Sequence, residues 1–334
     1  MRKLFAIIVL LVIVAAIAGS SMYSAWLETP VYSGSDPLVF EVARGDSMRR
    51  VAAQLGEQTG YSHPELLSFY AQRKGLASQV KAGEFEIPSG VTPDEFLEVL
   101  ISGKVVSYPL TLIEGWTFAQ MRDAVGKHPA IEHTVTTAAE IMSAIGQPDV
   151  HPEGRFYPDT YLVTKGQRDV EVYRKAFNIM TDLMDEAWSQ RDQDLPLKSA
   201  YEALILASII EKETGAEDER PEISGVFNRR LRKGMRLQTD PTVIYGVGDA
   251  YRGDITRKHL TTDTPYNTYT RSGLPPTPIA LPGRASLFAA VAPKAGKTLY
   301  FVATGSGDGR HFFSATLKEH NEAVQRYLAR TRGR

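Results

Sequence analysis

An unbroken apolar run near the N-terminus constrains this chain more than any other feature. Residues 4–22 hold no charged side chain over 19 positions, and Arg2 and Lys3 precede them. Such a run in a helix is just long enough to cross the hydrocarbon core of a bilayer, and cations before it place the rest of the chain outside the cytoplasm. We expect a retained membrane anchor. The alternative is a cleaved signal peptide, because the run is short and small residues follow it.

Composition narrows the classes of function that are open to the chain. The 334 residues carry a formal net charge of −1 and no cysteine. The near-neutral charge gives no general attraction for nucleic acid, and the lack of cysteine excludes disulfides, cysteine nucleophiles and thiolate zinc sites. No HExxH run is present, and the close pair His128 and His133 has no cysteine to complete a zinc-finger pattern. We therefore expect neither metal nor cofactor.

Residues 201–214 predict a buried helix that ends in two carboxylates. The segment YEALILASIIEKET lacks Gly and Pro and is rich in Leu, Ile and Ala, and Gly215 is expected to end it. The residues three, four and seven positions before Glu213 share its helical face and are all apolar: Ile210, Ile209 and Leu206. The same positions before Glu211 hold the smaller and more mixed set Ser208, Ala207 and Leu204.

Glu213 therefore lies in line with the apolar stripe, at its end. A carboxyl group there is expected to have a raised pKa, because desolvation disfavours its charged form. A general acid that holds its proton near neutral pH needs such a pKa. The alternative is an ordinary helix-end glutamate that is solvated or paired with Lys212 or an arginine.

Two further regions carry patterns with a chemical meaning. Residues 38–90 form a strand–turn–helix unit, and its opening VFEVARGDSMRRVAAQL and ending AGEFEIP resemble a LysM module, a type that binds N-acetylglucosamine polymers. A spacer is the alternative. Residues 266–269 and 273–279 are rich in amide, hydroxyl and aromatic groups, as sugar sites are; ordered loop packing is the alternative. Asp240 is expected to cap a helix that begins at Pro241.

Several long motifs resemble those of one enzyme family. They are EGRFYPDTY (153–161), ASIIEKET (207–214), RLQTDPTVIYG (236–246), YNTYTRSGLPPTPI (266–279) and YFVA (300–303). Together they resemble the endolytic murein transglycosylases, the MltG or YceG-like family. The resemblance covers nearly the whole chain. It implies an enzyme of the bacterial inner membrane that faces the periplasm and cleaves the β-1,4 bond between N-acetylmuramic acid and N-acetylglucosamine inside peptidoglycan strands, leaving a 1,6-anhydro end.

The resemblance also implies roles for residues. The essential glutamate of the family falls on Glu213, and Glu213–Thr214 is similar to the Glu–Ser pair of soluble lytic transglycosylases. One carboxyl group suffices when the 6-hydroxyl of the substrate is the nucleophile, because Glu213 acts first as acid and then as base. The family motifs and their chemistry assign further substrate-binding residues: Gln238, Asp240, Tyr266, Asn267, Tyr269 and Glu211, the last also being the alternative acid. Peptidoglycan synthases are implied as partners on nascent strands.

These expectations describe an α+β chain with a single transmembrane helix. Its parts are a cytoplasmic tail (1–3), the anchor (4–22), a linker (23–37), the LysM-like module (38–90), a strand–helix linking region (91–165) and a mixed α+β catalytic domain (166–334) with the glutamate at the end of a buried helix. Two other functions stay open. One is a non-catalytic, membrane-anchored peptidoglycan-binding protein, and the other is a hydrolase that uses Glu213 with Glu211 or Asp240 and yields reducing ends.

Overall fold

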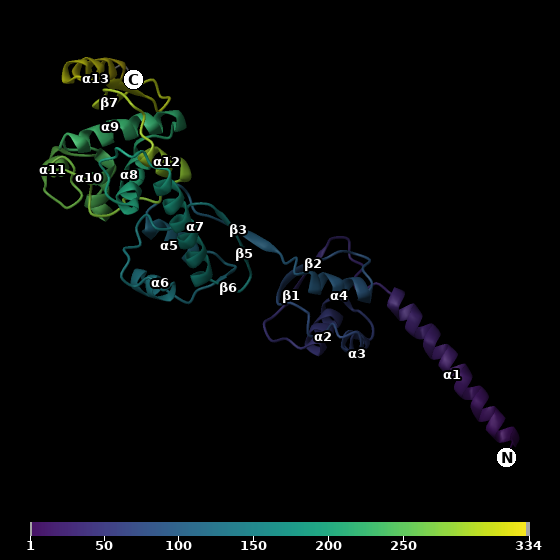
Figure 1. Ribbon diagram of the computed structural model, residues 1–334. Coiled ribbons are helices and arrows are strands. Elements are labelled where there is room, and N and C mark those ends of the chain that lie inside the picture. Colours follow the sequence, from purple (N-terminus) through teal and green to yellow (C-terminus); the bar gives the residue numbers. More distant parts are fainter. Residues whose placement is uncertain (1, 332–334) are drawn as a thin grey trace. The chain divides into compact units, whose positions relative to one another are not determined.

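The computed structural model describes residues 2–331 and divides the chain into two compact units (Figure 1). Within the described residues, unit 1 comprises 2–108 and 163–167, and unit 2 comprises 109–162 and 168–331. Met1 of the predicted tail and residues 332–334 of the predicted catalytic domain lie outside the described residues.

The N-terminal apolar run forms helix α1 (Arg2–Glu28). This helix is long and apolar enough to cross a membrane, with a mean hydropathy of 2.8 in its most apolar stretch. Its large apolar side chains, Leu10 and Leu11 among them, are mostly exposed all along the helix, an arrangement that suits lipid rather than water. The helix runs past the predicted span, and Trp26 near its end is buried with its ring 5.7 Å from that of Tyr70.

Unit 1 is a small strand–helix–helix–strand body followed by one more helix. Its elements are β1 (Leu38–Val42), α2 (Met48–Thr59), α3 (Pro64–Arg73), β2 (Gly83–Ile87) and α4 (Pro93–Ser102). Strands β1 and β2 pair antiparallel, with Leu38 opposite Ile87. Phe40, Phe85 and Phe96 are fully buried in the core. The likeness of this unit to a LysM module, and its binding of glycan, stay predictions.

Unit 2 is mainly helical, and its strands form short two-stranded sheets. Strand β3 pairs with β5, β4 with β6, and β7 with β8. The elements from the end of unit 1 onward are β3 (Ser107–Thr111), α5 (Phe118–Gly126), β4 (Ile131–Glu132), α6 (Ala138–Ala144), β5 (Thr160–Thr164), β6 (Gln167–Arg168), α7 (Asp169–Ser189), α8 (Ala200–Glu213), η1 (Glu217–Glu219), α9 (Arg220–Arg232), α10 (Asp240–Val247), η2 (Gly248–Ala250), α11 (Arg257–Thr261), α12 (Arg284–Val291), β7 (Tyr300–Ala303), β8 (His311–Ser314) and α13 (Leu317–Thr331).

Helix α8 lies at the centre of unit 2 (Figure 1). It packs against α7, α9, α10 and α12, and every residue from Ala203 to Ile210 is buried. Each fully buried Leu or Ile side chain stabilises the fold by about 1.5–3 kcal/mol. A helix packed on all sides in this way holds the residue at its end in a fixed place.

The end of α8 differs from the prediction in one detail. The helix stops at Glu213 because Thr214 has extended backbone, with φ −146° and ψ 138°. Gly215 was expected to end the helix in the left-handed conformation, but its φ is not positive. The Thr214 hydroxyl instead accepts a hydrogen bond from the amide of Ala216, at 3.0 Å, so the chain turns away from the helix one residue earlier.

Candidate active site

A cavity of about 570 Å³ lies beside the C-terminal end of α8. Residues from two sides of unit 2 line it. The first wall consists of Glu213, Arg230, Leu237, Gln238, Thr239, Asp240 and Tyr269, and the second wall, from β7, β8 and α13, consists of Tyr300, Phe301, Val302, Ala303, His311, Leu317, His320, Asn321 and Val324. The structure therefore places Glu213, Gln238, Asp240 and Tyr269, four of the predicted site residues, around one space.

The carboxyl group of Glu213 faces this cavity with one oxygen engaged and one free. The Thr239 hydroxyl donates a hydrogen bond to Oε1. Among residues 2–331, Oε2 has no hydrogen-bond partner, and it is not a buried atom. The pKa of Glu213 is raised to about 7, mainly because burial disfavours the charged form. The hydrogen bond from Thr239 lowers this pKa, the charge of Asp240 raises it, and the charge of Arg230 lowers it. A carboxyl group with this pKa exists in both protonation states near neutral pH.

Glu211 has a different environment, although it lies only two residues away on α8. Its Oε2 accepts hydrogen bonds from the amide of Gly283, at 3.0 Å, and the hydroxyl of Ser286, at 2.7 Å. Its Oε1 lies 3.6 Å from Nη2 of Arg220, and the Glu211 side chain is only 6% exposed. Glu211 does not line the cavity. The predicted contrast between the two helical faces is weak, because both faces are buried. The environments of Glu211 and Glu213 differ instead in the hydrogen-bond partners of their carboxyl groups.

The segment 237–240 presents Thr239 to Glu213 through an unusual backbone. Gln238 has φ +50°, in the left-handed region that non-glycine residues rarely adopt. Its amide donates to the carbonyl of Thr268, at 3.2 Å. Asp240 was expected to cap α10, but Thr239 is the N-cap residue and Asp240 is the first helical residue. The Asp240 carboxylate is not used as a cap because it accepts the hydroxyl of Tyr269, at 2.6 Å.

Arg230 joins the two walls of the cavity. Its Nη1 donates to the carbonyl of Leu237, at 2.7 Å, and its Nε donates to the carbonyl of Leu299, also at 2.7 Å. The guanidinium lies 5.2 Å from the centre of the Tyr300 ring. Arg230 is only 7% exposed, so its positive charge is held in a fixed place. Its N–H groups are largely occupied by the backbone carbonyls of Leu237 and Leu299.

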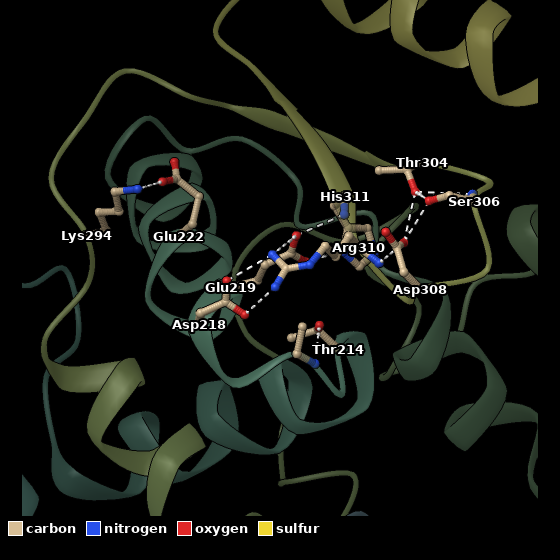
Figure 2. Close-up of polar contacts among 11 residues, drawn as sticks. Thr214, Asp218, Glu219, Glu222, Lys294, Thr304, Ser306, Asp308, Arg310 and His311 are labelled. Carbon is tan, nitrogen blue, oxygen red and sulfur yellow. Dashed lines mark hydrogen bonds and ion pairs between the residues drawn. The ribbon is translucent and has the colours of Figure 1, made fainter.

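Polar contacts attach the second wall to the turn that follows α8 (Figure 2). Arg310 donates to both carboxylate oxygens of Asp218, at 2.9 and 3.1 Å. Glu219 accepts the backbone amide of His311, at 3.0 Å, and lies 2.8 Å from Nδ1 of the same residue. Both acidic residues belong to η1. The turn that ends the glutamate-bearing helix therefore also holds the opposite side of the cavity.

Two of the predicted groove residues organise loops instead of lining this cavity. The Asn267 side-chain amide donates to the carbonyls of His259, Leu260 and Thr262. The Tyr266 hydroxyl lies 2.8 Å from the hydroxyl of Thr277. Neither Tyr266 nor Asn267 lines the cavity, and their contact with substrate, like that of Glu211, stays a prediction.

The sequence analysis missed several residues of the site. Thr239 lies between two predicted site residues in RLQTDPTVIYG, so the motif itself contained a signal for it. Arg230 lies just before that motif, on α9, but no pattern in the sequence pointed to it. His311 and His320 lie far from the motif in the chain, and only the packing of β8 and α13 brings them to the cavity.

A second carboxyl group with a raised pKa occurs elsewhere in unit 2. Burial raises the pKa of Glu153 to about 6. Its Oε1 accepts the amide of Phe118, at 2.8 Å, and its Oε2 accepts the hydroxyl of Tyr245, at 3.0 Å. Because both oxygens are engaged and Glu153 does not line the cavity, its role fits structural support better than proton transfer. Within residues 2–331, no group of three or more metal-ligating side chains is arranged to hold a metal ion.

Comparisons with known proteins agree on one family. A model of the YceG-like family matches residues 40–326. An endolytic murein transglycosylase of Bacillus subtilis (strain 168) is 31% identical over 333 residues, which cover 94% of this chain and 91% of the relative. An enzyme of the same name from Streptococcus pneumoniae (strain ATCC BAA-255 / R6) is 23% identical, and the match covers 86% of this chain and 58% of the relative.

A solved structure agrees with these sequence matches. The 2.6 Å crystal structure of a yceG-like protein from Listeria monocytogenes aligns with a TM-score of 0.53 and 29% identity. The alignment covers 86% of this chain and 99% of the other.

Proposed function

Because the chain belongs to the YceG-like family, we propose that it is a lytic transglycosylase that cleaves within the glycan strands of peptidoglycan. The curated relatives are named as endolytic murein transglycosylases. The observation that carries the proposal for this chain is the free Oε2 of Glu213, on a carboxyl group of pKa about 7 that faces a cavity.

The first step uses the protonated form of Glu213. With the β-1,4 bond at the end of α8, the Glu213 carboxyl donates its proton to the glycosidic oxygen as the bond from that oxygen to C1 breaks. Positive charge develops at C1 and the ring oxygen in such a reaction. The Asp240 carboxylate, which also lines the cavity, favours this positive charge electrostatically.

The second step uses the carboxylate form of Glu213. The 6-hydroxyl of the muramic acid residue attacks C1, and Glu213 removes the proton of this hydroxyl. The products are a strand with a free 4-hydroxyl and a strand with a 1,6-anhydro end. No water is consumed, and Glu213 regains its proton. Attack within one sugar residue has the usual advantage of an intramolecular reaction, so the scheme needs neither a second carboxylate nor a metal.

The proposal includes the location of the enzyme. We assign α1 as a retained single-pass anchor in the bacterial inner membrane, with both units on the periplasmic side. Its length and its apolar surface support this assignment, as do the two cations at its start. An anchored cleaver would act on nascent strands near the membrane and terminate their elongation beside peptidoglycan synthases. Unit 1 as a LysM-like glycan binder is part of the same proposal.

Mass spectrometry of released fragments tests the reaction. The full chain in detergent micelles is incubated with uncross-linked glycan strands, beside the E213Q variant. Fragments that end in 1,6-anhydromuramic acid, lighter than hydrolysis products by one water, and their loss in E213Q are the expected result. Reducing ends would show hydrolysis and implicate a second carboxylate, for which Asp240 is the candidate at the cavity. Glycan that binds without being cut would favour a binding protein.

A further inference from the structure

The two oxygens of the Glu213 carboxyl group are not equivalent. Oε1 accepts the hydroxyl of Thr239. Oε2 is unengaged within residues 2–331 and is accessible from the cavity side. A protonated carboxyl group has one oxygen that carries hydrogen and one that mainly accepts. A fixed donor at Oε1 therefore favours the form in which the proton lies on Oε2.

The Thr239 hydroxyl has little freedom to turn elsewhere, because the residue is held from its backbone. Its amide donates to the hydroxyl of Thr268, at 3.1 Å, and its carbonyl accepts the hydroxyl of Thr242, at 2.8 Å. The hydroxyls of Thr242 and Thr268 lie 2.9 Å apart. All three threonines are buried, Thr239 to 3% exposure. Within residues 2–331, the hydroxyl of Thr239 makes one hydrogen bond, which it donates to Glu213.

We propose that Thr239 is a positioning residue that fixes Oε1 of Glu213 as a hydrogen-bond acceptor, so that Oε2 alone delivers the proton to the glycosidic oxygen and later retrieves it from the 6-hydroxyl. This inference rests on the proposed function. Thr239 donates the same hydrogen bond in both steps and transfers no proton itself. Its contribution is to keep the working oxygen aimed at the cavity while the carboxyl group changes charge.

Other charged and titratable groups face the same space. Asp240 at the start of α10, Arg230 on α9, Tyr269, Tyr300 on β7, His311 on β8 and His320 on α13 line the cavity with Glu213. Removal of the Thr239 hydroxyl leaves these groups in place, so its effect on the pH profile is separable from theirs. A hydrogen bond donated to a carboxylate stabilises the charged form, so its loss raises the pKa of Glu213.

The experiment compares T239V and T239S in the full chain in detergent micelles. Valine keeps the shape of threonine and removes the hydroxyl. For T239V we expect kcat to fall by roughly 10- to 100-fold, since misaligned acid–base groups lose rate on this order, with KM changed less than about twofold. The alkaline limb of the kcat profile moves to higher pH. T239S keeps the hydroxyl, so both its kcat and the pH of its alkaline limb should be close to those of the wild-type chain.

A matched control and separate outcomes keep this test distinct from that of the proposed function. T181V makes the same substitution in α7, where the hydroxyl donates to the carbonyl of Phe177, at 2.9 Å, and it should leave kcat unchanged. Unchanged kcat and pH limb in T239V, with E213Q inactive, would overturn the role of Thr239 alone. Full activity in E213Q would overturn the proposed function. Failure of both T239V and T239A to fold would also reject the inference, since Thr239 would then be a structural residue.

Discussion

Glu211 and Glu213 show how neighbouring carboxylates acquire different roles. Glu211 has two hydrogen-bond donors and a nearby guanidinium, and these contacts satisfy its charge. Glu213 has one hydroxyl donor and lies beside the carboxylate of Asp240. A carboxyl group with few partners retains its proton at higher pH. The more poorly satisfied of the two groups is thus the one suited to acid–base chemistry.

Substitution of each glutamate by glutamine should separate activity from stability. E213Q should abolish cleavage, because an amide cannot donate or accept the proton, and the fold should remain. E211Q should keep most of its activity per folded molecule but lose about 1–3 kcal/mol of stability, because the buried Arg220 loses the nearest of its carboxylate partners and keeps only the longer contacts with Glu114 and Glu217. Product chromatography and urea unfolding of both variants measure this. Greater loss of cleavage in a folded E211Q than in E213Q would reverse the assignment.

The raised pKa of Glu213 also predicts how stability depends on pH. In the unfolded chain this group titrates near its ordinary value of 4.5, and in the folded chain near 7. Between these values the folded state holds the proton more tightly, so stability falls as pH rises from about 4.5 to about 7 and then stays lower. The shift corresponds to roughly 3 kcal/mol at pH 8. The stability of E213Q should not fall in this way, because glutamine does not titrate.

Unfolding of the wild-type chain and E213Q at pH 5 and pH 8 measures the effect. We expect E213Q to gain stability relative to wild type at pH 8 and to gain little at pH 5. Glu153 also titrates in this range, but it is present in both chains and cancels in the difference. A stability difference that is the same at both pH values would contradict the assigned pKa.

The turn η1 connects two functional elements of unit 2. It follows the end of α8 and binds the β7–β8 hairpin through Asp218 and Glu219 (Figure 2). The ion pair of Asp218 with Arg310 is exposed, whereas the Glu219 carboxylate is buried against His311. Exposed ion pairs contribute little to stability. The attachment of the second wall therefore depends mainly on Glu219.

Substitutions in η1 test this attachment. E219Q should raise KM for glycan strands by several-fold, because the second wall loses a buried charged partner. D218N, the matched control at the preceding residue of the same turn, should leave KM nearly unchanged, because its ion pair is exposed. Steady-state kinetics on defined glycan strands measure both. Equal effects of the two variants would show that the buried pair has no special part in shaping the cavity.

Sequence reasoning was most accurate where contacts are local. The helix that bears Glu213 was predicted over 201–214 and is observed over Ala200–Glu213, because apolar periodicity reports neighbours along one element. The hydrogen bond from Thr239 to Glu213 and the second wall of the cavity were not predicted. Both depend on the packing of segments far apart in the chain. Helix α8 also ends differently from the common glycine stop, because Thr214 adopts an extended backbone and its hydroxyl accepts the amide of Ala216.

The whole chain combines an apolar helix with two compact units. Trp26, near the end of α1, is buried in the core of unit 1. Signal cleavage before Trp26 would remove most of α1, including Tyr23, whose ring stacks on that of Trp26 with the ring centres 5.9 Å apart. We therefore expect the mature protein to keep residues 1–25. Intact-mass measurement of the membrane-extracted protein tests this, and a mass that lacks these residues would show a cleaved signal peptide.

The position of the second wall in the chain has a consequence for biosynthesis. The ribosome makes Glu213 well before it makes β7, β8 and α13, which close the cavity from the other side. A nascent chain that has reached only Glu213 thus lacks the second wall of the cavity. Under the proposed function, cleavage of glycan cannot begin until these later segments have been made and folded.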